Sequence, residues 1–124
     1  MSQCVLIVDD LASVRLYHST FLKRKGYECI GATDGFDALA KLKENKVGLI
    51  LLDLSMPNMT GQEFIEKVRS LPSCAQIPII LITSETSRES LNQMGLGSFT
   101  VITKPVLPEI LLQTVQNMLM PTAT

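Results

Sequence analysis

A series of short, uninterrupted apolar runs constrains the fold more than any other feature of this sequence. The runs cover residues 4–8, 47–52, 77–82 and 99–103, and a weaker candidate covers residues 27–31. Apolar runs without polar alternation are typical of strands that helices cover on both faces. The sequence therefore predicts five strands, most of them inside the molecule.

Helical patterns fill the intervals between these runs. Apolar residues between Val14 and Leu22 recur at helical spacing and stop before Gly26, and further helical segments cover residues 34–45 and 84–94. Another helix is expected to open at Thr60. The last helix has the clearest pattern, an apolar stripe formed by Leu107, Ile110, Leu111, Val115, Met118 and Leu119.

Strands that alternate with helices predict an α/β fold in which helices cover both faces of a parallel sheet. Because right-handed crossovers leave few topologies, we expect a five-stranded, flavodoxin-like (βα)5 three-layer sandwich with strand order 2-1-3-4-5. Hydrophobic residues make up 46% of the chain and charged residues 19%, which is a globular composition. We expect residues 1–124 to form one complete domain, with its core in residues 4–120 and a loose tail in residues 121–124.

The charge balance excludes several classes of partner. A net charge of −1 and a pI near 5.8 argue against electrostatic capture of nucleic acid or of an anionic membrane. No apolar stretch approaches the roughly 18 residues that span a bilayer, and the N-terminus lacks the pattern of a signal peptide, so we expect a cytoplasmic protein. Cys4, Cys29 and Cys74 are widely spaced, and we expect buried hydrophobic side chains rather than disulfides or a zinc site.

Polar side chains stand where the predicted strands end. They are Asp9, Asp10, Asp53, Thr83 and Lys104. In an open α/β sheet the carboxyl ends of the strands border the ligand crevice, so these groups are expected to converge on one small site. Three clustered carboxylates repel one another and need a cation, and hard oxygen ligands suit Mg²⁺. With Lys104 and Thr83 as donors, such a site supports phosphoryl transfer, with Asp53 as the nucleophile that becomes an aspartyl phosphate.

Four sequence blocks carry a family resemblance: Val-Asp9-Asp10, Asp53-Leu-Ser-Met-Pro-Asn-Met-Thr-Gly61, Thr83-Ser84 and Lys104-Pro105. Together they resemble the receiver domain of bacterial two-component response regulators, from residue 4 to about residue 120. The resemblance implies that Asp53 accepts a phosphoryl group from a phosphohistidine on a sensor histidine kinase or phosphotransfer protein. It also implies a signalling protein that catalyses only its own phosphorylation and dephosphorylation. If 124 residues is the natural length, the chain resembles single-domain regulators of the chemotaxis type; if the chain is excised from a larger regulator, its output segment lies outside this sequence.

The same resemblance implies the ligands of a Mg²⁺ ion. Asp10 and Asp53 would bind the ion directly, Asp9 would help through water, and the backbone carbonyl of Ser55 would be a further ligand. The only histidine, His18, lacks any kinase machinery around it, and we interpret it as an ordinary helix residue.

Further roles concern the phosphate and the shape of the loops. Lys104 would pair with the phosphate, and Thr83 would hydrogen-bond a phosphoryl oxygen in the active state. A cis peptide before Pro105 would aim Lys104. The turn after the phosphoacceptor would be shaped by Met56, Pro57 and Gly61.

One switch position departs from the family pattern. Three residues before Lys104 many receiver domains carry Tyr or Phe, whose ring moves inward with the Thr83 hydroxyl, but this chain has Val101. Phe99 lies two residues earlier, on the same expected face of the strand but at another place. We therefore expect phosphorylation to be retained and its readout to differ.

The C-terminal third of the chain is almost free of charge. Of 23 charged residues, only Lys104 and Glu109 lie between residues 90 and 124. Leu112 and Met120 fall off the main stripe of the last helix. An uncharged surface is a candidate interface, and we expect the face formed by the fourth helix, the fifth strand and the fifth helix to bind a downstream protein or a second copy of the chain.

Three other functions compete with this interpretation. A phosphatase or phosphomutase with an aspartate nucleophile needs a second acid two residues later, where this chain has Ser55. A flavin or nucleotide carrier needs a glycine-rich loop after the first strand, where Asp9 and Asp10 stand instead. A binding module that ignores phosphate remains open because of Val101.

Overall fold

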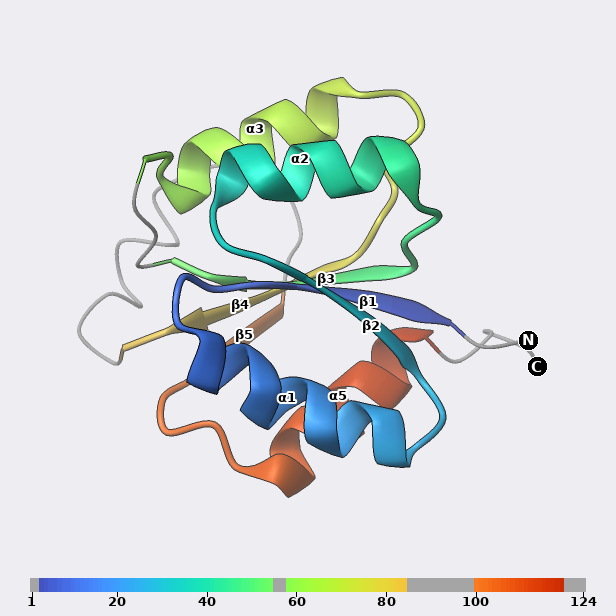
Figure 1. The fold of residues 1–124 in the computed structure, drawn as a ribbon, viewed down its shortest axis with the longest axis vertical. Coiled ribbons are helices and arrows are strands. Elements are labelled where there is room, and N and C mark those ends of the chain that lie inside the picture. The colour runs from blue at the N-terminus through green and yellow to red at the C-terminus, as the bar shows by residue number, and fades with distance from the viewer. Residues whose placement is uncertain (1–2, 55–57, 85–99, 120–124) are drawn as a thin grey trace.

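The sheet has the predicted topology. In the computed structural model, which describes residues 3–54, 58–84 and 100–119, five parallel strands lie in the order β2-β1-β3-β4-β5. This order and the helices on both faces confirm the flavodoxin-like sandwich (Figure 1). The strands are β1 (Cys4–Val8), β2 (Glu28–Ala32), β3 (Leu49–Asp53), β4 (Ile79–Thr83) and β5 (Thr100–Thr103).

β1 matches its predicted run, but β3 and β4 start two residues later than their apolar runs suggest, and this part of the prediction was wrong. β3 begins at Leu49 rather than at Val47, and β4 begins at Ile79 rather than at Ile77. Pro78 has no N–H to donate to a ladder, so the strand starts after it. The end of β3 agrees with the prediction, because Asp53 is its last residue.

Four helices are described. α2 (Gly35–Glu44) and α3 (Gly61–Ser70) cover one face of the sheet, and α1 (Ala12–Arg24) and α5 (Pro108–Leu119) cover the other (Figure 1). The helix predicted for residues 84–94 falls largely outside the described residues. Among the described residues, no helix is long and apolar enough to cross a bilayer.

Local sequence signals explain where α2 and α3 begin. The Asp34 carboxylate accepts a hydrogen bond from the Asp37 N–H at 2.8 Å, which satisfies a free donor of the first turn of α2. At α3, Thr60 and Glu63 exchange side-chain-to-backbone hydrogen bonds of 3.1 and 3.2 Å, a complete capping box.

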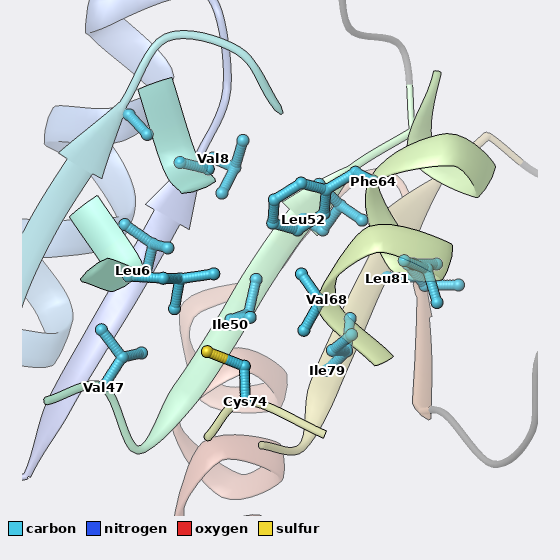
Figure 2. Close-up of a cluster of buried hydrophobic side chains, with 14 of the residues drawn as sticks. Leu6, Val8, Val47, Ile50, Leu52, Phe64, Val68, Cys74, Ile79 and Leu81 are labelled. Carbon is cyan, nitrogen blue, oxygen red and sulfur yellow. The ribbon is translucent and has the colours of Figure 1, made fainter. Parts of the chain in front are cut away.

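Two hydrophobic clusters sandwich the sheet. Side chains of β1, β3 and β4 that point toward α2 and α3 surround Phe64, which is fully buried (Figure 2). Side chains on the opposite face pack around Leu111 and Val115 of α5. The sheet is therefore rigidly held from both sides, and this fixes the edge at which the strands end.

The apolar stripe predicted for the last helix is only partly buried. Leu111 and Val115 are buried, but Leu107 and Ile110 are 55% and 51% exposed. Leu107 precedes α5, and its carbonyl accepts the first bond of the helix, so its side chain is not held on the helical stripe. Leu112, expected to lie off the stripe, packs against the core instead.

The three cysteines are free thiols. Cys4 and Cys74 are buried as expected, whereas Cys29 is only half-buried. Burial raises the pKa of the Cys29 thiol to about 11 and raises the pKa of Cys4 as well, so both thiols stay protonated at neutral pH.

Candidate functional site

The strand ends bring the predicted acidic and cationic residues together. Asp9 and Asp10 follow β1, Asp53 ends β3, and Lys104 follows β5. All four line one cavity of about 450 Å³ at the carboxyl edge of the sheet. The convergence inferred from the sequence is therefore present for these four side chains.

An ion pair crosses this cavity. The Lys104 ammonium Nζ lies 3.0 Å from Asp53 Oδ2. The Lys104 side chain is 45% exposed, whereas that of Asp53 is 9% exposed, so the carboxylate lies deeper than its partner. The Lys104 N–H donates to the Thr83 carbonyl at 2.9 Å, and the peptide between Lys104 and Pro105 is cis, as the resemblance implied.

Asp9 is an acid of the site with a clearly raised pKa. Burial, followed by the nearby Asp53 and Asp10 carboxyl groups, raises the pKa of Asp9 to about 6, although its carboxylate accepts the Leu11 N–H at 2.9 Å. Arg15 Nη1 donates to the Asp9 backbone carbonyl at 2.6 Å and helps to fix the turn after β1. The crowded carboxylates therefore keep a proton on Asp9 up to about pH 6, well above its ordinary pKa of 3.8.

The donor set fits a hard divalent cation. A buried carboxylate with a raised pKa, next to two more carboxylates, gains from a positive ion that replaces the proton. Within the described ranges, no three His, Cys, Asp or Glu side chains already have the arrangement of a metal-binding group. Asp10 is exposed, and Ser55, whose carbonyl was expected to be a further ligand, lies outside the described residues together with Met56 and Pro57.

The two switch positions lie on the neighbouring strands β4 and β5. Thr83 is buried at the end of β4, and its hydroxyl donates to the Ser84 carbonyl at 3.3 Å. Val101 is half-buried and packs against the cluster under α2 and α3. Phe99, the nearby aromatic residue, lies outside the described residues.

The apolar wall of the cavity was missed by the sequence analysis. It consists of Leu11, Val14, Tyr17, His18 and Val106, with Ile82 and Pro105. Leu11, Val14 and His18 recur at helical spacing behind the acidic pair, and this pattern could have placed them on the site side of α1. The Tyr17 hydroxyl donates to the Val106 carbonyl at 3.0 Å and ties α1 to the segment after β5.

His18 is buried behind the acidic residues. Its side chain is 3% exposed, and burial lowers its pKa, so the ring is neutral at neutral pH. Its Nδ1 has no hydrogen-bond partner among the described residues. It is a helix residue as expected, but one that lies inside the candidate site.

Known proteins share both this fold and this sequence pattern. The family model of the response regulator receiver domain matches residues 5–116. The chain therefore belongs to the response regulator receiver family, whose members are signalling proteins of two-component systems and not conventional enzymes. Receiver domains generally bind Mg²⁺ at the phosphorylation site and interact with sensor histidine kinases or phosphotransfer proteins.

Its relatives include single-domain chemotaxis regulators. The chemotaxis response regulator CheY4 of Vibrio cholerae matches with a TM-score of 0.88 and 40% identity, over 96% of this chain and 100% of that chain. The chemotaxis protein CheY1 of Helicobacter pylori is 36% identical over 86% of this chain and 89% of its own length. The Vibrio cholerae CAI-1 autoinducer sensor kinase/phosphatase CqsS is 34% identical over 90% of this chain, which spans only 16% of that kinase. The chain is thus a CheY-like receiver with a phosphorylation-responsive, chemotaxis-like signalling role.

Proposed function

We propose that Asp53 accepts a phosphoryl group from a phosphohistidine on a sensor histidine kinase or phosphotransfer protein. The ion pair between Lys104 Nζ and Asp53 Oδ2, at 3.0 Å in an acidic cavity, is the observation that carries this proposal. An Asp53 carboxylate oxygen forms a bond to phosphorus while the phosphorus–nitrogen bond of the donor breaks, and the electron pair remains on the imidazole. The domain itself supplies the positioning and the charge neutralisation.

A Mg²⁺ ion would be held by carboxylates that the structure brings to one cavity. Asp10 and Asp53 would bind it directly and Asp9 through water, with the Ser55 carbonyl as a further ligand. When bound, the ion supplies positive charge to the phosphoryl oxygens. The ion would also favour the ionised form of Asp9, because it supplies a counter-charge to a buried carboxylate whose pKa is otherwise raised to about 6.

Lys104 and Thr83 would complete the phosphoryl site. Lys104 would leave Asp53 and pair with a phosphoryl oxygen, since it is half exposed and carries a flexible stem. Thr83 would exchange its bond to the Ser84 carbonyl for one to a phosphoryl oxygen. Because Val101 offers no ring to follow this motion, we propose that the signal leaves the site without the usual aromatic switch.

The phosphodonor would approach over an apolar rim of the cavity. We define this apolar rim as Leu11, Tyr17 and Leu107, which are 56%, 40% and 55% exposed. Leu11 and Tyr17 line the cavity, and Leu107 follows Val106, to which Tyr17 is bonded. Exposed apolar side chains beside an acceptor site favour a protein donor over a free ion.

The C-terminal face, formed by β5 and α5, would bind the partner that receives the signal. The protein would act in the cytoplasm. Lys104 and Glu109 are the only charged residues between residues 90 and 124, and Lys104 belongs to the site. A nearly uncharged surface over β5 and α5 fits a downstream protein or a second copy of the chain, and it offers no basic patch for nucleic acid or an anionic membrane.

Replacement of the nucleophile tests the proposal. With Mg²⁺ and acetyl phosphate, the wild type should gain the mass of one phosphoryl group, and Asp53→Asn should gain none. Asp37→Asn, in the first turn of α2, is a matched control that should be phosphorylated normally. If Asp53→Asn accepts phosphate as readily as the wild type, the assignment is wrong.

One observation keeps a second function open. Val101 cannot act as an aromatic switch, so the chain could bind its partner regardless of phosphate. A phosphate-independent binding module would bind the partner equally with and without Mg²⁺ and beryllofluoride. A change in affinity on adding both would favour the phosphorylation switch.

A further inference from the structure

A hydrogen bond joins the loop after the phosphoacceptor to the start of α2. The Asn58 side-chain amide Nδ2 donates to Asp34 Oδ2 at 2.8 Å, across 24 positions of sequence. Asn58 has a φ of 71°, a left-handed conformation that asparagine tolerates better than most residues. The residue therefore combines an unusual backbone turn with a long-range contact.

Asp34 serves two partners with its two oxygens. Oδ1 accepts the Asp37 N–H at 2.8 Å and caps α2, while Oδ2 accepts the Asn58 amide. These hydrogen bonds, that of Asp37 first, lower the pKa of Asp34, so the carboxylate is ionised at neutral pH. A charged acceptor strengthens both bonds, and the capped helix gives the loop a fixed support.

A second contact lies beside the first. Met59 is 3% exposed and packs on Gly35, the first residue of α2. A Cβ at Gly35 would lie 2.5 Å from the Met59 sulfur, so the absence of a side chain at Gly35 permits this approach. Two adjacent loop residues thus rest on two adjacent residues at the start of α2.

The near end of the same loop is also held. The Leu54 N–H donates to the Ile82 carbonyl at 3.2 Å, and the Leu54 side chain packs where a Cβ of Gly61 would lie. Asp53 is therefore followed at once by one anchor, and Asn58 supplies the second. Removal of the second anchor frees Asn58 from α2, so that ordering this part of the chain costs more conformational entropy when an ion or phosphoryl group binds.

We propose that Asp34 and Asn58 are positioning residues for the phosphorylation site. Their hydrogen bond holds Asn58, which follows Asp53 by five positions, against α2, and its loss weakens divalent-cation binding about tenfold, as loss of an outer contact does at other metal sites. This inference rests on the proposed function of Asp53. Neither residue touches the reacting atoms, so both act through the loop.

Two substitutions break the contact and leave local structure intact. Asn58→Gly removes the amide but tolerates the left-handed backbone. Asp34→Ser keeps a hydroxyl that can cap α2 but has no second oxygen for Asn58. Asn45→Gly is the control, because it removes a similar amide hydrogen bond, to the Lys41 carbonyl at 3.1 Å, at the far end of α2.

Calorimetric titration of the whole domain with Mg²⁺, and urea unfolding without it, test the proposal. Each single variant should bind Mg²⁺ about tenfold more weakly than the wild type and the control, and the double variant should bind as weakly as either single one, since both break the same bond. Unfolding midpoints of the two variants should match that of the control.

Other results would overturn the inference. Mg²⁺ affinities equal to wild type, or losses that simply multiply in the double variant, would show that the contact does not position the site. A loss of affinity that follows a fall in the unfolding midpoint would make the contact merely structural. If the wild type itself takes up no Mg²⁺ at millimolar concentration, the proposed metal site fails first, and the positioning role fails with it.

Discussion

The two faces of the sheet differ in how many of their large apolar side chains are buried and in whether side chains cap their helices. On the face of α2 and α3, side chains of Asp34 and Thr60 cap both helices, and Phe64 fills the cluster beneath them. On the face of α1 and α5, α1 begins after Leu11 without a side-chain cap. The large apolar residues that remain exposed on this face are Leu11, Leu16, Tyr17, Leu107 and Ile110.

We call the face covered by α2 and α3 the closed face, and the face covered by α1 and α5 the open face. The difference between them suggests that the two faces have separate roles around one site. On the closed face, Asn58 is hydrogen-bonded to Asp34 at the start of α2. The apolar rim belongs to the open face, where exposed side chains can meet a partner. If Asp53 is the phosphoacceptor as proposed, the closed face would hold it in place and the open face would stay available for a partner.

The largest expected effect concerns the closed face. Phe64→Ala should lower the free energy of unfolding by about 3–5 kcal/mol, because it empties the centre of the cluster under α3. Urea unfolding measures this loss. Phe36→Ala, at a phenylalanine that is 58% exposed, is the matched control and should change stability by less than about 0.5 kcal/mol. Similar losses of unfolding free energy for the two variants would show that the cluster around Phe64 does not give the closed face its stability.

The next effect concerns the acidic edge that both faces share. An unfolded Asp9 ionises near its ordinary pKa of 3.8, whereas the folded one ionises near 6, so the wild type loses stability as pH rises between these values. Asp9→Asn removes this loss. In EDTA the variant should be more stable than the wild type by about 1–2 kcal/mol at pH 8 and no more stable at pH 3. A difference that stays constant across this pH range would show that ionisation of Asp9 does not cause it.

Helix capping gives effects of about 1 kcal/mol with opposite signs. Thr60→Ala destroys the capping box of α3 and should destabilise the domain by about 1 kcal/mol. Leu11 has an extended backbone at the start of α1, so Leu11→Ser supplies a missing cap and should stabilise the domain by about 0.5–1 kcal/mol. If Leu11→Ser destabilises the domain, the missing side-chain cap of α1 is not what weakens this helix.

The smallest effect on stability comes from the apolar rim. Leu107→Ser should change the free energy of unfolding by less than about 0.5 kcal/mol, since the side chain is already 55% exposed. Phosphotransfer from a cognate phosphohistidine protein should nevertheless slow several-fold, while phosphorylation by acetyl phosphate should stay unchanged. If phosphorylation slows equally with both donors, Leu107 contributes to the phosphoryl-transfer step and not to binding of the protein donor.

The sequence predicted the parts of the molecule that depend on local pattern. Apolar runs predicted the strands, and polar residues at their ends predicted the cavity that holds Asp9, Asp53 and Lys104. Parallel strands place all their carboxyl ends at one edge, so no long-range contact had to be known.

Other features depend on contacts between distant residues. Leu107 has the spacing of a core residue, but the start of α5 at Pro108 leaves it outside the helix. The bond between Asp34 and Asn58 depends on how close the loop after β3 comes to α2, which neither segment encodes alone. Likewise, the cavity wall from Tyr17 to Val106 forms only when α1 packs beside the segment after β5.

The protonated thiols of Cys4 and Cys29 have a practical consequence. Thiol reagents attack the thiolate, so these two side chains are poor targets at neutral pH, and Cys74 is shielded by burial. The chain also has no tryptophan to obscure an added fluorophore. A single cysteine introduced at an exposed position such as Glu66 can therefore be labelled selectively in an otherwise native background.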